Sequence, residues 1–190
     1  EMLSGAYMEL RKDQEALATL MLAYKKGLVT EEKKIMQVVR LNMFLEIPYG
    51  AGVILEAEMK RGRIERSEKN LDLLLGAWTG SREFDKAIAT IDELAPLKED
   101  GELYMQKAIL FNEQGEWGKV AEAAQQAVDK GGLRRPGDAW VLLGMAYAEL
   151  QKFDDALAAF AEARKVGDDG ARRNAGAWID FVNDRKAARG

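Results

Sequence analysis

The 190-residue chain contains no cysteine and no histidine. These absences exclude disulfide bonds, thiol nucleophiles, zinc sites built on cysteine or histidine, and imidazole acid–base chemistry. No apolar run approaches the roughly 20 residues of a membrane-spanning helix. With a formal net charge of −4, the chain also lacks the basic excess typical of nucleic-acid-binding proteins. We therefore expect neither a membrane span nor a nucleic-acid partner.

Two common ligand motifs are missing as well. The sequence has neither the glycine-rich loops that cradle phosphate groups nor the spaced aspartates of an EF-hand calcium loop. The adjacent acidic pairs Asp154–Asp155 and Asp168–Asp169 lie where helices are expected to begin, so we interpret them as helix caps and first-turn anions. We predict no catalytic residue, no cofactor and no metal, and the chain is expected not to be an enzyme.

The stretch 137–170 predicts a pair of antiparallel helices. Apolar and small residues recur there at the spacing that places them on one face of a helix. In the first helix they are Trp140, Leu143, Gly144 and Tyr147, and in the second they are Ala156, Phe160 and Ala163. The polar residues Gln151 and Lys152 interrupt the pattern and indicate the turn. We expect the small Gly144 and Ala156 to let the two backbones approach closely.

The spacing W-x2-L-G-x2-Y, followed by A-x3-F-x2-A, resembles the tetratricopeptide repeat, whose period is about 34 residues. Weaker versions recur earlier in the chain. The resemblance implies an all-α, right-handed superhelical solenoid of about five helix-turn-helix repeats, forming a single domain over residues 1–190. The expected repeats are approximately 1–30, 31–66, 67–99, 100–134 and 137–169, followed by a capping helix at 171–188. Because the chain begins inside the first helix of a repeat, we expect it to be the C-terminal part of a longer protein.

Turns and connectors follow from glycine and polar residues. Within repeats, turns are indicated at 79–81, 114–116 and 151–152. Between repeats, three connectors combine glycine with an aliphatic residue, which is Leu28, Ile64 or Leu133 and lies seven positions before the next repeat's first anchor residue. We expect each of these residues to fold back onto a helix end that the glycine terminates.

Residues 171–188 form the predicted capping helix. Ala175, Trp178, Ile179 and Val182 give it one apolar stripe, while its end is basic. A cation-rich C-terminus suits the helix dipole, and the alternative is that it docks an acidic partner or a membrane surface.

Solenoids of this family mostly bind other proteins, and the resemblance implies a concave groove lined by the first helix of each repeat. In this family the side chains one and five positions after the anchor point into the groove. The corresponding candidate protein-binding residues are Met36, Arg40, Asp72, Met105, Ile109, Val141 and Met145, together with Gly76. The apolar set of the fourth and fifth repeats suits a peptide with hydrophobic anchors, unless the superhelix itself covers it.

Three functions remain open. The leading hypothesis is a non-enzymatic protein–protein interaction scaffold that binds a peptide or protein segment in the groove. The second is a self-associating module, so a homo-oligomer is possible. The third, an RNA-binding helical repeat, is disfavoured by the acidic balance of the chain.

A further resemblance concerns the cellular compartment. Segments 47–74 and 129–150 are similar to bacterial tetratricopeptide proteins of the Gram-negative envelope, some of which are encoded beside the TonB–ExbB–ExbD system. This likeness implies a periplasmic scaffold whose partner is an envelope transport component. The cysteine-free composition suits the periplasm and the cytoplasm equally.

Overall fold

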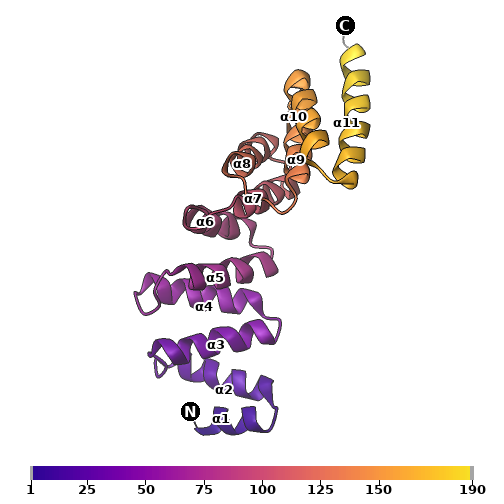
Figure 1. The fold of residues 1–190 in the computed structure, drawn as a ribbon. Helices are drawn as coiled ribbons and strands as arrows, with labels where there is room; N and C mark the ends of the chain where they lie inside the picture. Colours follow the sequence, from indigo (N-terminus) through magenta and orange to yellow (C-terminus); the bar gives the residue numbers. More distant parts are fainter. Residues whose placement is uncertain (1, 189–190) are drawn as a thin grey trace. The chain divides into compact units, whose positions relative to one another are not determined.

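The computed structural model describes residues 2–188. Within these residues the backbone forms eleven α-helices, one short 3₁₀ helix and no β-strand (Figure 1). The α-helices are α1 (Met2–Glu9), α2 (Asp13–Lys25), α3 (Glu32–Phe44), α4 (Pro48–Lys60), α5 (Glu68–Gly80), α6 (Phe84–Leu94), α7 (Glu102–Glu113), α8 (Trp117–Lys130), α9 (Pro136–Glu149), α10 (Phe153–Val166) and α11 (Asp169–Ala187). The 3₁₀ helix η1 (Ala95–Leu97) follows α6 directly. The predicted all-α class is confirmed.

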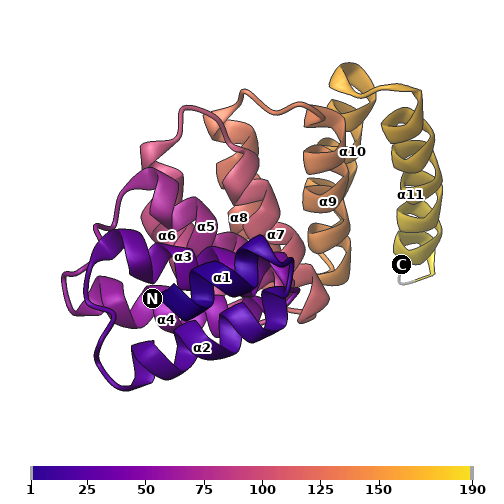
Figure 2. The same ribbon diagram turned by 90° about the horizontal axis from the view of Figure 1, so that it is seen from below.

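The chain divides into two compact units, and the division falls between Thr90 and Ile91, within α6. In the first unit, each helix from α1 to α5 packs against the next one along the chain. In the second unit the same holds from α7 to α11, and α11 also contacts α9 (Figure 2). Each unit is therefore built from helices that are neighbours in sequence, as expected for stacked helical repeats.

The turn inside each helix pair contains one residue in the left-handed backbone conformation. The φ angles are 54° at Arg11, 58° at Glu46, 58° at Arg82, 71° at Gly115 and 62° at Gln151. The turns predicted at 114–116 and 151–152 are therefore confirmed. The turn predicted at 79–81 lies slightly later, because α5 continues to Gly80 and the left-handed residue is Arg82.

Three connectors between helix pairs begin with a glycine cap, whereas α6 runs directly into η1. Gly27, Gly62 and Gly131 follow α2, α4 and α8 closely with φ angles of 73°, 72° and 73°. After α2, the Gly27 N–H donates to the Tyr24 carbonyl at 2.9 Å and the Leu28 N–H donates to the Ala23 carbonyl at 3.0 Å, which is the Schellman arrangement.

After Gly27 and Gly62, the residue that folds back onto the helix end lies two positions after the glycine. Val29 is 3% exposed and Ile64 is 1% exposed, so the prediction for Ile64 is confirmed. The prediction for Leu28 is wrong, since its side chain is 70% exposed. The physical reason is that the left-handed glycine fixes the path of the chain. The position of the buried residue is therefore set by its distance from the glycine and not by its distance from the next repeat.

A buried carboxylate joins two helix pairs of the first unit. Glu58 on α4 is fully buried and accepts hydrogen bonds from the Tyr24 hydroxyl of α2 at 2.7 Å and from Arg61 at 2.6 Å. Arg63 in the following connector also donates to it, through Nη2 at 2.9 Å. Burial alone would raise the pKa of the Glu58 carboxyl, but the hydrogen bonds from Arg63, Tyr24 and Arg61 outweigh it and hold the pKa below its ordinary value. Glu58 is therefore a charged cross-link between α2 and α4.

Candidate protein-binding site

The seven candidate groove residues fall in both units. Met36 and Arg40 on α3 and Asp72 on α5 belong to the first unit, and Met105, Ile109, Val141 and Met145 on α7 and α9 belong to the second. Met36 and Val141 are buried, at 6% and 8% exposure. Arg40 and Asp72 are exposed, Met105 and Met145 are half-buried, and Ile109 is 44% exposed.

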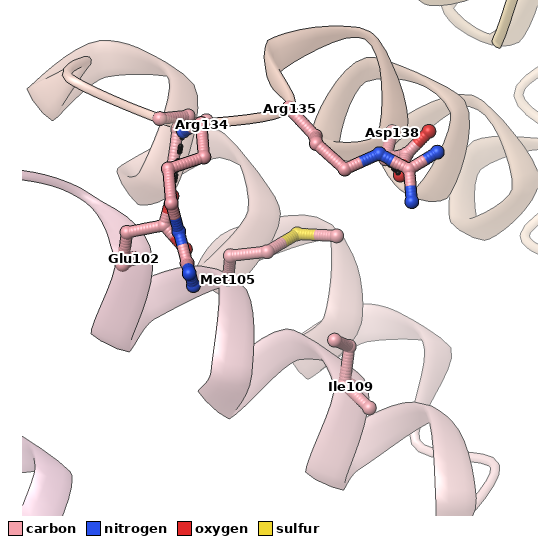
Figure 3. Close-up of a pocket in the computed structure, with 7 residues that line it drawn as sticks. Glu102, Met105, Ile109, Arg134, Arg135 and Asp138 are labelled. Atoms are coloured by element: carbon pink, nitrogen blue, oxygen red, sulfur yellow. Dashed lines mark hydrogen bonds and ion pairs between the residues drawn. The ribbon is translucent and has the colours of Figure 1, made fainter.

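Met105 and Ile109 lie about one helical turn apart on α7 and line a hollow of about 370 Å³ (Figure 3). The hollow is bounded by α7, by the connector after α8 and by the first turn of α9. Its lining residues are Glu102, Met105, Ile109, Leu133, Arg134, Arg135 and Asp138. All of them belong to the second unit, so this is a site that the unit forms by itself.

Glycine brings the connector against the start of α7. The Gly101 N–H donates to the Gly131 carbonyl at 2.8 Å. A Cβ at residue 101 would lie 2.3 Å from the carbonyl oxygen of Ala127, so this contact between the two segments requires glycine. Leu133 follows Gly131 by two positions, as Val29 follows Gly27, but Leu133 is half-buried and faces the hollow.

The first charged pair of the hollow joins Glu102 on α7 to Arg134 in the connector. The Arg134 backbone N–H donates to Glu102 Oε1 at 2.6 Å, and Arg134 Nη2 lies 3.1 Å from Glu102 Oε2. The Arg134 guanidinium and backbone N–H hold the pKa of the Glu102 carboxyl below its ordinary value, and the carboxylate raises the pKa of Arg134. Both groups therefore stay charged at neutral pH.

The second pair joins Arg135 to Asp138, with 2.9 Å between Arg135 Nε and Asp138 Oδ2. Arg135 Nη2 also lies 3.7 Å from Oδ2 of Asp168, the residue that caps α11 by accepting a hydrogen bond from the Ala171 N–H at 2.9 Å. That backbone hydrogen bond and the nearby Arg135 hold the pKa of the Asp168 carboxyl below its ordinary value.

The arginines carry more donors than these carboxylates use. A guanidinium has five N–H donors. The side chains of Arg134 and Arg135 are 85% and 66% exposed. In contrast, the side chains of Glu102 and Asp138 are only 29% and 31% exposed. The hollow thus combines an apolar part, made of Met105, Ile109 and Leu133, with a rim that offers cationic donors to an incoming group.

The sequence prediction and the hollow overlap in part. Met105 and Ile109 are brought together, whereas Val141 belongs to the hydrophobic core around Phe160 and Met145 packs against that core. The charged residues of the rim were not predicted. Glu102 and Arg134 are far apart in sequence and carry no motif, although the two arginines directly after Leu133 could have drawn attention to that connector.

A second hollow, of about 480 Å³, belongs to the first unit and lies between α2 and the turn that joins α3 to α4. Leu17, Met21 and Ile47 contribute apolar surface there, beside the buried amide of Asn42, which donates to the Val38 carbonyl at 2.8 Å. None of the candidate groove residues lines it.

Residues 2–188 contain no cluster of three or more side chains suited to holding a metal ion. Across the same residues, no helix combines the length and the apolar character needed to cross a bilayer.

Comparisons with known proteins place the fold. No protein-family model matches the chain, and no curated protein matches it. Solved structures do match the chain. YrrB, a tetratricopeptide protein "with an unusual peptide-binding site", superposes with a TM-score of 0.60 at 15% identity, over 93% of this chain and 88% of YrrB.

MamA from Desulfovibrio magneticus RS-1, residues 41 to the end, gives a TM-score of 0.60 at 15% identity over 84% of this chain and 88% of MamA. The C-terminal part of a tetratricopeptide repeat-containing protein from Cytophaga hutchinsonii gives 0.55 at 11% identity, over 86% of this chain and 63% of that one. Identities this low establish the fold alone. The chain therefore has the fold of the tetratricopeptide repeat proteins, as its Trp-Leu-Gly-Tyr motif predicts.

Proposed function

We propose that the chain is a non-enzymatic protein-interaction scaffold that binds a segment of another protein in the hollow between α7, the connector 131–135 and α9. The observation that carries the proposal is the pairing of an apolar surface with exposed arginines. Met105, Ile109 and Leu133 supply a site for one large apolar side chain, since partly exposed apolar side chains in a concave site gain free energy when they are covered.

The charged rim predicts what lies beside that apolar anchor. Glu102 and Asp138 are each engaged by an arginine, so they do not attract a basic ligand strongly. The free donors of Arg134 and Arg135 suit a carboxylate. The preferred ligand is therefore a peptide with a large apolar residue next to aspartate or glutamate.

The fold comparison supports a role in protein binding, because one of the similar structures is described as having a peptide-binding site.

The proposal also includes the predicted arrangement of the chain as a single array of five repeats that α11 caps. The exposed Arg40 and Asp72 stay predicted contacts in the first unit. Because Met36 and Val141 are buried within their own units, variants at those positions report on packing.

A library of displayed random peptides of about twelve residues tests the proposal. Peptides are selected on the wild type and then measured individually against Ile109→Glu, which places a charge in the apolar part of the hollow. Leu150→Glu is the matched control, since Leu150 is 38% exposed, lies in the same unit and does not line the hollow. We expect apolar-acidic peptides that bind the wild type and Leu150→Glu but lose at least about tenfold in affinity for Ile109→Glu, which corresponds to about 1.4 kcal/mol.

Two outcomes would overturn the assignment. Peptides that bind all three proteins equally would place the binding surface outside the hollow. Failure to select any peptide from a library that covers apolar-acidic sequences would remove the peptide-binding role itself.

The proposed compartment is the bacterial envelope, as the resemblance of segments 47–74 and 129–150 implies. Osmotic-shock fractionation of cells that express the natural gene tests it. We expect the protein to be released with periplasmic markers, and retention with cytoplasmic markers would reject an envelope location.

A further inference from the structure

The last helix of the second unit is covered along one side. α11 packs against α10 and α9, and its Ala175 and Val182 are completely buried there. Lys186 Nζ reaches Asp154 Oδ1 of α10 at 2.5 Å, which adds a charged contact to the same side. Figure 2 shows α11 at the edge of this unit, with α9 and α10 to one side of it.

A second apolar strip runs along the flank of α11. Ala177, Trp178 and Phe181 line a shallow hollow of about 220 Å³. The Trp178 ring stacks on the buried Phe160, with 6.0 Å between centroids and 14° between planes. Phe181 meets Trp178 edge-on at 5.4 Å and is 44% exposed. The strip therefore has a small residue, Ala177, one turn before a protruding aromatic residue.

We propose that this strip is a self-association surface on which α11 of one copy pairs antiparallel with α11 of a second copy. When the twofold axis passes between Ala177 and Phe181, the Phe181 ring of each copy lies over Ala177 of the other. The protruding side chain then enters the hollow beside the small one, which is how helix surfaces interlock in an isologous contact.

Two charges on one edge of the strip, Arg173 and Asp184, favour a second copy in antiparallel orientation, while the Arg185 guanidinium lies over the Phe181 ring, 5.3 Å from its centroid. Arg173 and Asp184 lie on the same edge of the strip, at nearly equal distances before and after its centre. Both side chains are exposed, and neither forms an ion pair within the described part of the chain, although Arg173 lies near enough to Asp168 to help lower the pKa of that carboxyl. Antiparallel pairing places Arg173 of each copy opposite Asp184 of the other, which gives two reciprocal ion pairs. In a parallel arrangement Arg173 lies at the level of the other copy's Arg173, and Asp184 at the level of the other Asp184, so neither ion pair forms.

The size of the surface sets the expected strength. One pair of helices buries less than the roughly 1,200 Å² of a stable protein interface, so the dimer is weak and its detection needs high concentration. This inference is independent of the peptide-binding proposal, because the strip lies on α11 and does not contribute to the hollow beside α7.

Sedimentation velocity from about 10 µM to about 1 mM, without peptide, tests the proposal. We expect a monomer–dimer equilibrium for the wild type. Arg173→Asp replaces both ion pairs by repulsive contacts between carboxylates and should raise the dissociation constant about tenfold, and Asp184→Arg should do the same. An equimolar mixture of these two variants restores two opposite-charge contacts in the heterodimer, so mixing should recover the wild-type affinity.

Phe181→Glu should abolish the dimer, whereas Leu150→Glu should leave it unchanged. A chain that stays monomeric up to about 1 mM would overturn the proposal and leave the strip for another occupant. A dimer that tolerates Phe181→Glu and Arg173→Asp, or single variants that fail to recover on mixing, would place the contact elsewhere.

Discussion

Gly144 of α9 lies directly against the ring of Phe160 of α10. A Cβ atom at residue 144 would come within 2.5 Å of Phe160 Cε1, closer than nonbonded carbon atoms approach. Phe160 is completely buried and cannot yield by moving into solvent. The glycine and the phenylalanine of the repeat motif are therefore two halves of one packing contact, which sets the separation of α9 and α10.

Gly144→Ala should consequently destabilise the protein. The added methyl group forces Phe160 or the helix backbone to shift, and overpacking of this kind costs about 1–3 kcal/mol. Urea denaturation followed by far-ultraviolet circular dichroism measures the loss. Gly176→Ala on α11 is the control, because a Cβ there meets nothing within 4 Å and should stabilise the helix by up to about 1 kcal/mol. Equal effects of the two substitutions would contradict the packing argument.

The left-handed turn residues predict a second pair of opposite effects. Glu46 is exposed and has a φ of 58°, a conformation that costs a residue with a Cβ about 1–2 kcal/mol. Glu46→Gly should remove that cost. Because glycine also increases the entropy of the unfolded chain, the free energy of unfolding should rise by only up to about 1 kcal/mol.

Gly115 occupies the equivalent turn with a φ of 71°, so Gly115→Ala should lower the free energy of unfolding by about 1 kcal/mol. Urea titrations of both variants beside the wild type give the two differences. If both substitutions shift the midpoint in the same direction, backbone conformation does not control these turns.

The helices were predictable because the packing of Trp140, Gly144, Tyr147 and Phe160 leaves a periodic pattern in sequence. The exact position of the turn after α5 was not predictable. Gly80 indicates a turn in the sequence, but Arg82 is the residue that takes the left-handed conformation. A residue with a Cβ adopts that conformation when the packing of two helices requires it, and the local sequence does not indicate where this happens.

The candidate site was predictable only in part, for a similar reason. Position within the repeat identified Met105 and Ile109, since it fixes the direction in which a side chain leaves its helix. It does not fix how much neighbouring helices cover that side chain, and Val141 is buried in consequence. The ion pair between Glu102 and Arg134 joins residues 32 positions apart, so it exists only once the connector has packed on α7.

The connector after α2 gives a third prediction that separates two adjacent residues. Val29 is 3% exposed whereas Leu28 is 70% exposed. Val29→Ala should cost about 2 kcal/mol, because it removes buried apolar surface and leaves a cavity. Leu28→Ala removes a larger side chain from solvent and should change stability by less than about 0.5 kcal/mol. Thermal melts of the two variants measure both losses of stability. A larger loss for Leu28→Ala than for Val29→Ala would mean that the glycine does not determine which residue folds back onto the helix end.

The buried Glu58 gives a fourth prediction, which depends on pH. Glu58→Gln keeps the shape of the side chain but weakens the charge-assisted hydrogen bonds from Arg61, Arg63 and Tyr24. At pH 7 the variant should lose about 1–3 kcal/mol, the range for hydrogen bonds to a charged group. Glu56→Gln on the same helix is the control, since the Glu56–Lys60 pair is partly exposed and should contribute less than about 1 kcal/mol.

The direction of the pH effect follows from linkage. The pKa of the Glu58 carboxyl is lower in the folded protein than its ordinary value of 4.5, so the unfolded chain binds the proton more readily. The stabilisation by Glu58 is therefore fully present above about pH 4.5 and is lost as the pH falls through the lower folded pKa. Urea titrations of the wild type and Glu58→Gln at several values between pH 7 and pH 2 should give free energies of unfolding that converge at the acidic end. A difference that stays constant over this range would show that the Glu58 side chain acts through its shape and not through its charge.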